Sequence, residues 1–335
     1  MKVLFLSPVF FPSRGGVETV VEQVAKTFSE KGHDVKVATE TFSNQQDAFL
    51  FDLYRRPTGR ELRLLFKWAD IVWHHQLCLR QMGRSFQFPR KMGATFHTWL
   101  PTGGVSSVLR RALISKFAAR YGVSGAIAAQ LPNPTGVLPN SFDVTRFRLP
   151  ESNSVRKWKF GYVGRLVSDK GVDLFLDAIE ILHRSGSMVH CAIAGEGEEK
   201  ERLMRRVAAL NMIQFVEFLP WLGGTDLVEF YQNCEVCVIP SRWSEPFGLV
   251  ALEAIACGAV VIAAESGGLP EAVGRCGLYF SRGDAGDLVD KMRILLRGGA
   301  DKRLSFLCHR NTHLSQFLPE KQFDAYLNAF MQMLK

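Results

Sequence analysis

Short, continuous apolar runs along the chain alternate with stretches whose apolar positions recur at helical spacing. At the N-terminus an apolar run at 2–7 is followed by a glycine-containing loop, a predicted helix over 17–31 and a second apolar run at 34–39. Continuous apolar runs are typical of parallel strands that are buried on both faces. The order strand, glycine loop, helix, strand therefore predicts the opening of a doubly wound, Rossmann-like domain.

The same alternation continues after this unit and restarts after a polar, proline-containing linker over 147–157. The remaining strands are predicted at 49–54, 71–74, 94–97, 127–128, 136–138, 160–164, 189–194, 213–219, 236–239 and 260–263. The remaining helices are predicted at 108–121, 172–184, 198–209, 225–233, 285–296 and 319–334. This pattern predicts two α/β domains, the first over 1–148 and the second over 149–318.

Length and composition agree with a soluble protein of about two domains. The chain has 335 residues, of which 47% are apolar and 22% are charged. No apolar run reaches the roughly 18 residues of a membrane span, and the apolar N-terminus is interpreted as a first strand rather than a signal peptide. Seven scattered cysteines favour free thiols in a reducing cytosol. Cys234 and Cys237 form a C-x-x-C without a second pair, so core packing is the better interpretation.

The net charge of +8 is concentrated in the first half of the chain. Residues 1–150 hold 20 basic and 10 acidic residues, whereas the remainder holds 21 and 23. Residues 108–121 read as a basic amphipathic helix, which can lie on an anionic membrane or pack on the sheet with its arginines solvated. We expect the first half to meet an anionic membrane surface or an anionic substrate.

The stretch 241–268 has the features of a phosphate-binding site. It follows an apolar run, and it contains a loop acid (Glu245), a glycine-bearing turn over 247–250 and a helix with Glu253. The N–H groups at a helix start and the positive end of its dipole favour anions. A second loop carries Arg165 and Lys170 five positions apart beside a glycine. Most such cation pairs are solvated surface residues, but this pair can converge on a diphosphate.

These residues resemble a known family. Glu245 and Glu253, eight positions apart around Phe247-Gly248-Leu249, resemble the E-x7-E motif of glycosyltransferase family 4, the retaining glycosyltransferases of GT-B fold. Gly15-Gly16-Val17-Glu18 resembles the family's N-terminal G-G-x-E, and the segment 164–171 resembles its pyrophosphate-binding loop. The segment 140–143 reads N-S-F-D where the family usually has N-G-V-D, and Pro220-Trp221 stands where a glycine is common.

The resemblance implies a GT-B fold, in which two Rossmann-like doubly wound domains face each other across a cleft and the last helix, 319–335, packs back on the first domain. It implies that Glu253 holds the ribose and that Glu245 holds the donor sugar. A lone histidine is more often structural, but the family places one at His97, beside the transferred sugar; His74 and His75 are weaker candidates for the acceptor side. The implied catalytic residues are His97, Glu245, Arg165 and Lys170. The implied donor-binding residues are Gly15, Gly16, Gly164, Arg165, Lys170, Gly195, Gly197, Glu245, Phe247, Gly248, Leu249, Val250 and Glu253.

The function implied is a retaining hexosyltransferase that uses a UDP- or GDP-sugar and a glycan or lipid-linked acceptor in bacterial cell-envelope polysaccharide or lipopolysaccharide synthesis. No D-x-D occurs, so neither a metal nor another cofactor is expected. The expected location is the cytoplasm, including the cytoplasmic face of the membrane, and no nucleic-acid partner is expected. The alternatives are a non-catalytic, membrane-associated scaffold of the same fold, and another GT-B enzyme such as a sugar phosphorylase or an epimerase. A nicotinamide oxidoreductase fits less well because no G-x-G-x-x-G opens either domain.

Overall fold

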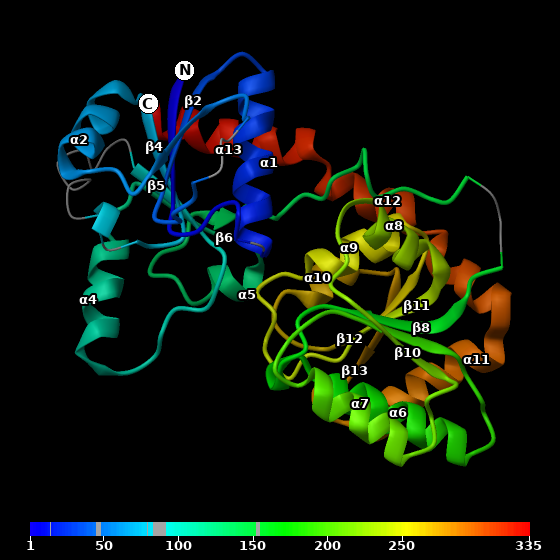
Figure 1. Ribbon diagram of the computed structural model, residues 1–335. Helices are drawn as coiled ribbons and strands as arrows, with labels where there is room; N and C mark the ends of the chain where they lie inside the picture. Colours follow the sequence, from blue (N-terminus) through cyan, green and yellow to red (C-terminus); the bar gives the residue numbers. More distant parts are fainter. Residues whose placement is uncertain (14, 45–47, 79, 83–91, 152–154) are drawn as a thin grey trace. The chain divides into compact units, whose positions relative to one another are not determined.

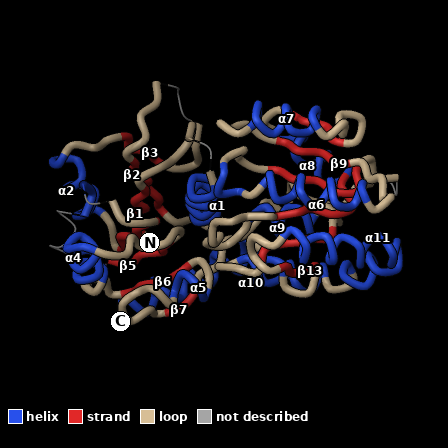
Figure 2. Tube along the Cα trace, turned by 90° about the horizontal axis from the view of Figure 1, so that it is seen from below, coloured by secondary structure: helices blue, strands red, loops and turns tan. Residues whose placement is uncertain are grey.

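The computed structural model describes residues 1–335 except 14, 45–47, 79, 83–91 and 152–154. The described chain divides into two compact units. Unit 1 comprises residues 1–141 and 317–335, and unit 2 comprises residues 142–316. Each unit is built on its own parallel sheet, and Figure 2 shows the strands of each sheet with their own set of helices. Residues 83–91 of the basic first half and residues 152–154 of the polar linker are among those outside the described residues.

Unit 1 contains a sheet of seven parallel strands in the order β3-β2-β1-β4-β5-β6-β7. Its strands are β1 (Lys2–Ser7), β2 (Asp34–Thr39), β3 (Asp52–Arg55), β4 (Ile71–His75), β5 (Met92–Phe96), β6 (Ala119–Gly122) and β7 (Gly136–Val137). Its helices are α1 (Gly16–Glu30), α2 (Gly59–Trp68), α4 (Gly104–Ile114), α5 (Gly125–Ala128) and α13 (Pro319–Leu334). Strands β4 and β5 are buried along their whole length and β1 is buried from Val3 onward, as expected for the centre of a sheet that is covered on both faces.

Helix α13 packs in unit 1 through an aromatic face. Phe323 lies 4.7 Å and Phe330 5.3 Å, between ring centroids, from Phe28 of α1. Tyr326 is fully buried, and its hydroxyl lies 3.1 Å from Thr95 Oγ1 on β5. Because each buried aromatic side chain removes a large apolar area from water, this face contributes several kcal/mol, about 2–3 for each ring. Leu334, the last residue of the apolar face, is 46% exposed.

Unit 2 contains a sheet of six parallel strands in the order β10-β9-β8-β11-β12-β13. Its strands are β8 (Trp158–Val163), β9 (Cys191–Ala194), β10 (Val216–Leu219), β11 (Cys234–Ile239), β12 (Val260–Ala264) and β13 (Gly277–Phe280). Its helices are α6 (Val172–Arg184), α7 (Lys200–Ala209), α8 (Gly224–Asn233), α9 (Leu249–Ala256), α10 (Leu269–Val273), α11 (Ala285–Leu307) and α12 (Arg310–Leu314), with 3-10 turns η2 (Ser168–Lys170) and η3 (Ser315–Phe317). Figure 1 shows α8, α9, α10 and α12 on one face of this sheet and α6, α7 and α11 on the other.

The two parallel Rossmann-like sheets confirm the α/β fold class. Two local predictions are wrong. The predicted helix over 108–121 is the shorter α4 followed by β6, because residue 119 begins a strand that pairs with β5. The Arg120 side chain donates to the backbone carbonyls of Ser115, Phe117 and Asn133. Residues 127–128 form the end of α5 rather than a strand, because Ser124 caps a helix by accepting from Ile127 N.

Candidate active site

The candidate site in unit 2 lies where strands β8 and β11 end. These strands are neighbours in the sheet, but the chain continues outward from β8 through β9 and β10 and from β11 through β12 and β13. The order of the strands therefore reverses between β8 and β11. Ligands of open parallel sheets bind at this reversal, outside the carboxyl ends of the strands. Six of the site residues predicted from the sequence lie in the loops after β8 and β11, namely Gly164, Arg165, Lys170, Glu245, Phe247 and Gly248.

A short ion pair joins these two loops. Lys170 Nζ, in η2 after β8, lies 2.6 Å from Glu245 Oε1 in the loop after β11. Ser241 Oγ donates to the same carboxylate oxygen at 2.6 Å. The Lys170 and Glu245 side chains are only 20% and 15% exposed. A pair shielded from water to this extent interacts more strongly than a surface pair, so it fixes both side chains at the end of the sheet.

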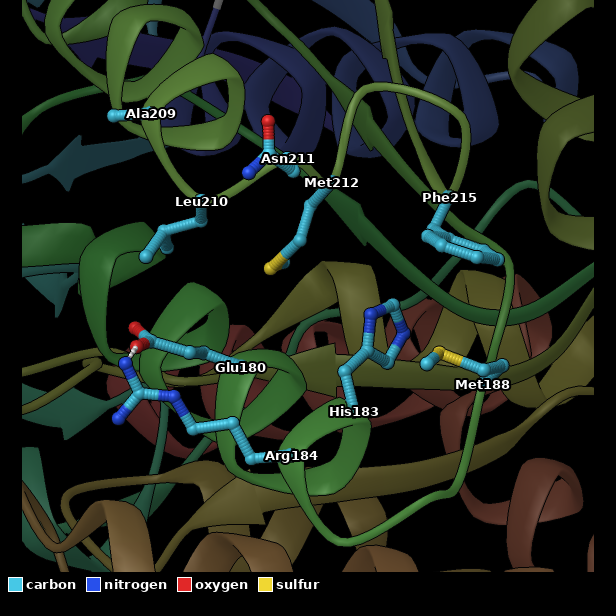
Figure 3. Close-up of a pocket in the computed structure, with 9 residues that line it drawn as sticks. All are labelled: Glu180, His183, Arg184, Met188, Ala209, Leu210, Asn211, Met212 and Phe215. Atoms are coloured by element: carbon cyan, nitrogen blue, oxygen red, sulfur yellow. Dashed lines mark ion pairs between the residues drawn. The ribbon is translucent and has the colours of Figure 1, made fainter.

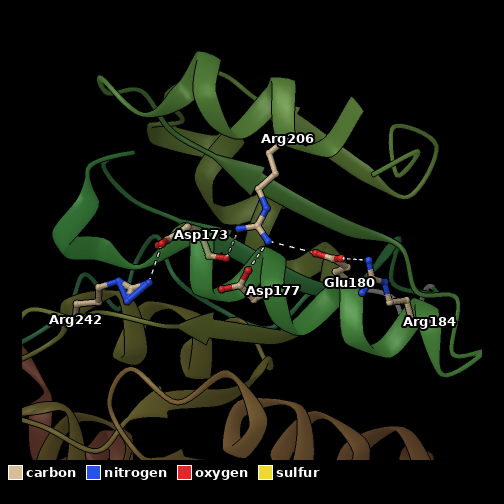
Figure 4. Close-up of polar contacts among 6 residues, drawn as sticks. All are labelled: Asp173, Asp177, Glu180, Arg184, Arg206 and Arg242. Atoms are coloured by element: carbon tan, nitrogen blue, oxygen red, sulfur yellow. Dashed lines mark hydrogen bonds and ion pairs between the residues drawn. The ribbon is translucent and has the colours of Figure 1, made fainter. Parts of the chain in front are cut away.

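The loop after β11 is held against η2 by further contacts. The backbone N–H groups of Arg242 and Trp243 each donate to Asp169 O at 2.9 Å. The Arg242 guanidinium also bonds Asp173 Oδ2 at 2.7 Å, in the first turn of α6 (Figure 4). Further along α6, Figure 4 shows Arg206 of α7 with Asp177 and Glu180. The contacts to Asp169 and Asp173 fasten the loop to η2 and α6 and so maintain the approach of Lys170 to its partner, whereas Arg206 joins α7 to α6.

Glycines allow the loop after β8 to approach the loop after β11 and the loop after β9 closely. Gly171 has φ +66°, and a Cβ atom there would lie 2.1 Å from Pro240 O, so only glycine follows Lys170 without displacing β11. A Cβ atom on Gly195 would lie 1.9 Å from Gly164 O. The structure thus gives the two predicted donor-site glycines Gly195 and Gly164 a packing contact between loops. Gly197 packs against the same loop, at Leu166.

Arg165 differs from Lys170 in its surroundings. The Arg165 side chain is exposed and, within the described residues, forms no ion pair. Its carbonyl accepts from Tyr162 Oη at 2.8 Å. Burial raises the pKa of Tyr162, so its hydroxyl stays protonated as a donor. The backbone at this position is therefore held in place while the guanidinium is available to an anion in solution.

The start of α9 supplies the third part of the site. Helix α9 begins at Leu249, and Gly248, with φ +118°, precedes it without a side-chain cap. The N–H groups of the first helical turn have no partner within the helix and favour an anion at this end. Phe247 is buried beneath the turn. The helix start therefore presents Leu249 and Val250 amides beside the loop that carries Glu245.

Glu253 lies on α9, one turn from the helix start, and is held by a contact that the sequence did not indicate. Tyr231 Oη, at the end of α8, donates to Glu253 Oε2 at 2.8 Å. Burial raises the pKa of Glu253 to about 6, although the tyrosine hydrogen bond favours its ionised form. The pKa of this carboxyl group therefore lies above the ordinary value for a glutamate, and Tyr231 limits the rise.

The carboxyl end of α9 is held by two arginines that sequence reasoning also missed. Arg156 donates to the carbonyl of Cys257 at 3.1 Å, and Arg310 Nε donates to Ile255 O at 3.0 Å. Arg310 also donates to Ala256 O at 2.5 Å. Cations are favourable at this end of a helix, where the last carbonyls lack partners. No motif marks these arginines, because they act through tertiary contacts from distant parts of the chain.

Gly15, Gly16 and His97 belong to unit 1. Gly15 precedes α1 in extended conformation and Gly16 is its first residue, so both lie at the start of a 15-residue helix. His97 directly follows β5, and its Nε2 lies 3.0 Å from His75 Nδ1. Burial lowers the pKa of His97 to about 3 and that of His75 well below its ordinary value, so both rings are neutral near pH 7. The side chain of His74 points to the opposite face of the sheet from that of His75, and its ring packs edge-on against Phe117.

A separate hollow of about 410 Å³ lies in unit 2 at the opposite end of α6 from Lys170 (Figure 3). His183 on its wall is bonded to the backbone of Val189, and Glu180 is paired with Arg184. None of the residues predicted for the donor site lines this hollow. The His183, Glu180 and Arg184 side chains on its wall are thus engaged with one another or with the backbone.

Residues 145–306 match the model of the family described as "Glycosyl transferases group 1". A curated relative, the D-inositol 3-phosphate glycosyltransferase of Saccharomonospora viridis, is 32% identical over 224 residues, which are 61% of this chain and 51% of that protein. The chain thus spans about half the length of this curated relative. A match to glycogen synthase of Mycobacterium tuberculosis strain H37Rv is 35% identical and covers 40% of this chain and 33% of that protein.

Solved structures match over almost the whole chain. Alr3699/HepE of Anabaena in complex with UDP superposes with a TM-score of 0.82 at 17% identity, covering 99% of this chain and 100% of that one. The same protein in complex with UDP-glucose gives a TM-score of 0.78 at 18% identity, covering 99% and 100%. The lipopolysaccharide outer core galactosyltransferase WaaB gives 0.73 at 17% identity, with 99% of both chains covered. At this identity the likeness establishes a fold of GT-B type.

Proposed function

The chain belongs to the glycosyl transferases group 1 family, and we propose that it is a retaining glycosyltransferase that moves a hexose from a nucleotide-diphospho-sugar to an acceptor hydroxyl. The observation that carries the proposal is the Lys170–Glu245 pair at the carboxyl ends of β8 and β11, beside the start of α9. This arrangement places a cation, an acid and helix amides together where a diphospho-sugar offers phosphates and sugar hydroxyls.

The proposed roles follow from where charge develops. When the bond from the anomeric carbon to the diphosphate oxygen breaks, negative charge grows on the leaving diphosphate. Lys170, Arg165 and the amides of residues 249–250 neutralise this charge. The acceptor oxygen forms its bond to the anomeric carbon on the same face, and its proton passes to the departing diphosphate. Retention of configuration here rests on family membership.

The remaining predicted residues orient the donor. Glu245 accepts hydrogen bonds from hydroxyls of the sugar, and Glu253 accepts from the ribose. The family resemblance also assigns His97, Gly15 and Gly16 of unit 1 to the donor, and we keep these three residues as proposed donor contacts. The neutral state of His97 supports a hydrogen-bonding rather than a charged role. No metal takes part in this proposal, because lysine, arginine and helix amides supply the charge compensation.

The donor nucleotide proposed first is UDP, with GDP as the second candidate. Support for UDP comes from Alr3699/HepE, which was solved with UDP and with UDP-glucose. For the acceptor we propose a glycan or lipid-linked glycan of the bacterial cell envelope, such as lipopolysaccharide. The likeness to WaaB supports this assignment at the level of fold.

We further propose that unit 1 meets an anionic membrane surface on the cytoplasmic side. Helix α4 exposes Val108 and Leu109, by 68% and 60% respectively, next to Arg110 and Arg111. Apolar side chains flanked by cations suit the boundary of an anionic bilayer, where each basic residue contributes about 1 kcal/mol. No helix of the described residues has the length and apolar character needed to cross a bilayer.

The scaffold alternative predicts a protein of this fold that binds no donor, and a phosphorylase or epimerase predicts other donor chemistry. Arg165, Lys170, Glu245 and Glu253 are all present, which favours catalysis. A thermal-shift panel of UDP, GDP, ADP and TDP with their common sugars, without added metal, distinguishes these functions. A ligand that binds only the folded chain raises its melting temperature. We expect a clear shift with one base; no shift with any nucleotide would favour the scaffold.

A further inference from the structure

The hydrogen bond between Tyr231 and Glu253 joins two helices at the donor site. Tyr231 is fully buried, and its ring packs edge-on against Phe147 with centroids 6.0 Å apart. Its carbonyl accepts from Arg156, the arginine that also caps α9. The tyrosine is therefore fixed at its ring, at its backbone and at its hydroxyl. A side chain held in this way has little freedom to release the carboxylate that it contacts.

We propose that Tyr231 is a positioning residue that aims the Glu253 carboxylate at the ribose hydroxyls, so that the enzyme selects ribonucleotide donors over deoxyribonucleotide donors. Its hydroxyl donates to Oε2 at 2.8 Å, which leaves Oε1 to accept from the ligand. A buried carboxylate without such a donor turns or takes up a proton, and either change removes an acceptor from the ribose. The inference rests on the proposed function, since it assigns Glu253 to the ribose.

The groups around Glu253 show why the hydrogen bond from Tyr231 matters most for its carboxylate. Cys237 on β11 and Cys257 at the end of α9 are neutral thiols, because burial raises the pKa of each to about 12. Asp143 and Arg146 precede β8 and lie 3.6 Å from each other as an ion pair, so their effects on the carboxylate oppose one another. Burial also raises the pKa of Tyr231 far above its ordinary value, which keeps the hydroxyl a donor. Among the groups that face Glu253, Tyr231 makes the hydrogen bond.

The test measures the preference for ribose. UDP, GDP and their 2′,3′-dideoxy analogues are titrated calorimetrically into the wild type and Tyr231→Phe. The matched control is Tyr279→Phe, which removes a hydroxyl that donates to Gly274 O in the same unit, away from Glu253. We expect Tyr231→Phe to reduce the ratio of ribo to dideoxy affinity by about tenfold, the effect of a hydrogen bond to a charged group. The control keeps the wild-type ratio.

Two further readouts separate positioning from a general loss of structure. In Glu253→Gln, adding Tyr231→Phe should leave the ribose preference unchanged, because the tyrosine acts through the carboxylate. We expect binding of the preferred diphosphate by the wild type to weaken below about pH 6, and this pH should rise in Tyr231→Phe, since the lost donor favoured the ionised acid.

Different results would contradict the positioning role of Tyr231 and the proposed function of the protein. An unchanged ribose preference in Tyr231→Phe, with a wild type that prefers ribose, overturns the positioning role and leaves the proposed function standing. A further tenfold loss when Tyr231→Phe is added to Glu253→Gln also overturns it. A wild type that binds none of the four nucleotides overturns the proposed function itself.

Discussion

Lys170 and Glu245, which lie 75 positions apart in the chain, form a 2.6 Å ion pair that bridges the loops after β8 and β11. The cation assigned to the diphosphate and the acid assigned to the sugar thus contact each other. In the proposed site, a bound diphosphate would compete with Glu245 for the lysine, while hydroxyls of the donor sugar would replace the lysine as donors to the acid. On this proposal donor binding exchanges one set of partners for another and leaves neither charge unpaired.

Lys170→Ala should lower turnover by about two to three orders of magnitude, because it removes a cation that we propose neutralises the charge developing on the leaving diphosphate. The measurement is steady-state transfer from the donor identified by the thermal-shift panel. Lys159→Ala is the matched control, since Lys159 forms a comparable pair with Glu235, at 2.7 Å and with side chains 25% and 21% exposed. A rate near that of the wild type in Lys170→Ala removes the lysine from the diphosphate site.

Glu245→Gln should separate binding from turnover. The glutamine side chain has the shape of the glutamate and can keep the hydrogen bond from Ser241. Because it is uncharged, it no longer attracts Lys170 away from the diphosphate. We expect UDP without a sugar to bind about fivefold more tightly, on the order of 1 kcal/mol for a partly buried charge pair, while sugar transfer falls. Calorimetry with UDP and a transfer assay measure the two effects. Weaker binding of UDP would show that the acid does not compete for the lysine.

Unit 1 should lose stability in mild acid because of its buried histidines. Burial lowers the pKa of His74 and of His97 from 6.5 to about 3, and that of His75 also falls well below 6.5. Between pH 6.5 and pH 3 the unfolded chain therefore binds more protons than the folded chain, and stability falls as pH drops. Three such groups give a slope of at most about 4 kcal/mol per pH unit. Glu253 in unit 2 has a smaller, opposite effect. Because burial raises its pKa from 4.5 to about 6 in the folded chain, its contribution to stability increases as pH falls from 6 to 4.5.

His74→Leu tests the origin of that slope. Neither ring nitrogen of His74 has a hydrogen-bond partner among the described residues, and its ring contacts Phe117. Leucine should therefore raise the free energy of unfolding by about 1–3 kcal/mol and reduce the number of protons taken up on unfolding by about one. Urea titrations at pH 5 and pH 7 give both quantities. An unchanged pH dependence would assign the acid sensitivity to other groups.

We expect membrane binding through α4 to depend both on the basic residues and on the exposed apolar residues of this helix. We expect the protein to bind vesicles that contain anionic lipid and to dissociate as salt rises, since the charges lie at the surface. Replacing Val108 and Leu109 by serine should weaken binding. Leu64→Ser is the control, because Leu64 is also 60% exposed but lies on α2. Absent or salt-insensitive vesicle binding would favour a soluble acceptor.

The sequence predicted the parallel sheets and most elements well where apolar runs were long and punctuated by glycine. The helix over 172–184 and the strand over 34–39 have the predicted bounds. Prediction failed at 119–121. Basic residues recur between apolar ones over 108–121, as they do on an amphipathic helix, so these last residues were included in the predicted helix. What decided the outcome there was strand pairing with β5, a contact between distant residues that no local pattern contains.

At the candidate site, the motif residues could be found from the sequence but their partners could not. The string around Glu245 and the loop with Lys170 are local patterns, so both were singled out. Their mutual ion pair depends on the two loops meeting at neighbouring strand ends. Tyr231 and Arg310 are ordinary residues of ordinary helices until the fold brings them to α9. Sequence patterns indicated the residues that we propose carry the chemistry, whereas tertiary contacts decide which groups hold those residues in place.

The most direct test of the central claim is a calorimetric titration of UDP and GDP into the wild type, Lys170→Ala and Lys159→Ala in metal-free buffer. We expect the wild type and Lys159→Ala to bind one of the two nucleotides with equal affinity. Lys170→Ala should bind it at least about tenfold more weakly, because a charge-assisted contact to the diphosphate is lost. Equal affinity in all three proteins, or no binding to the wild type, would contradict a nucleotide-sugar site at the ends of β8 and β11.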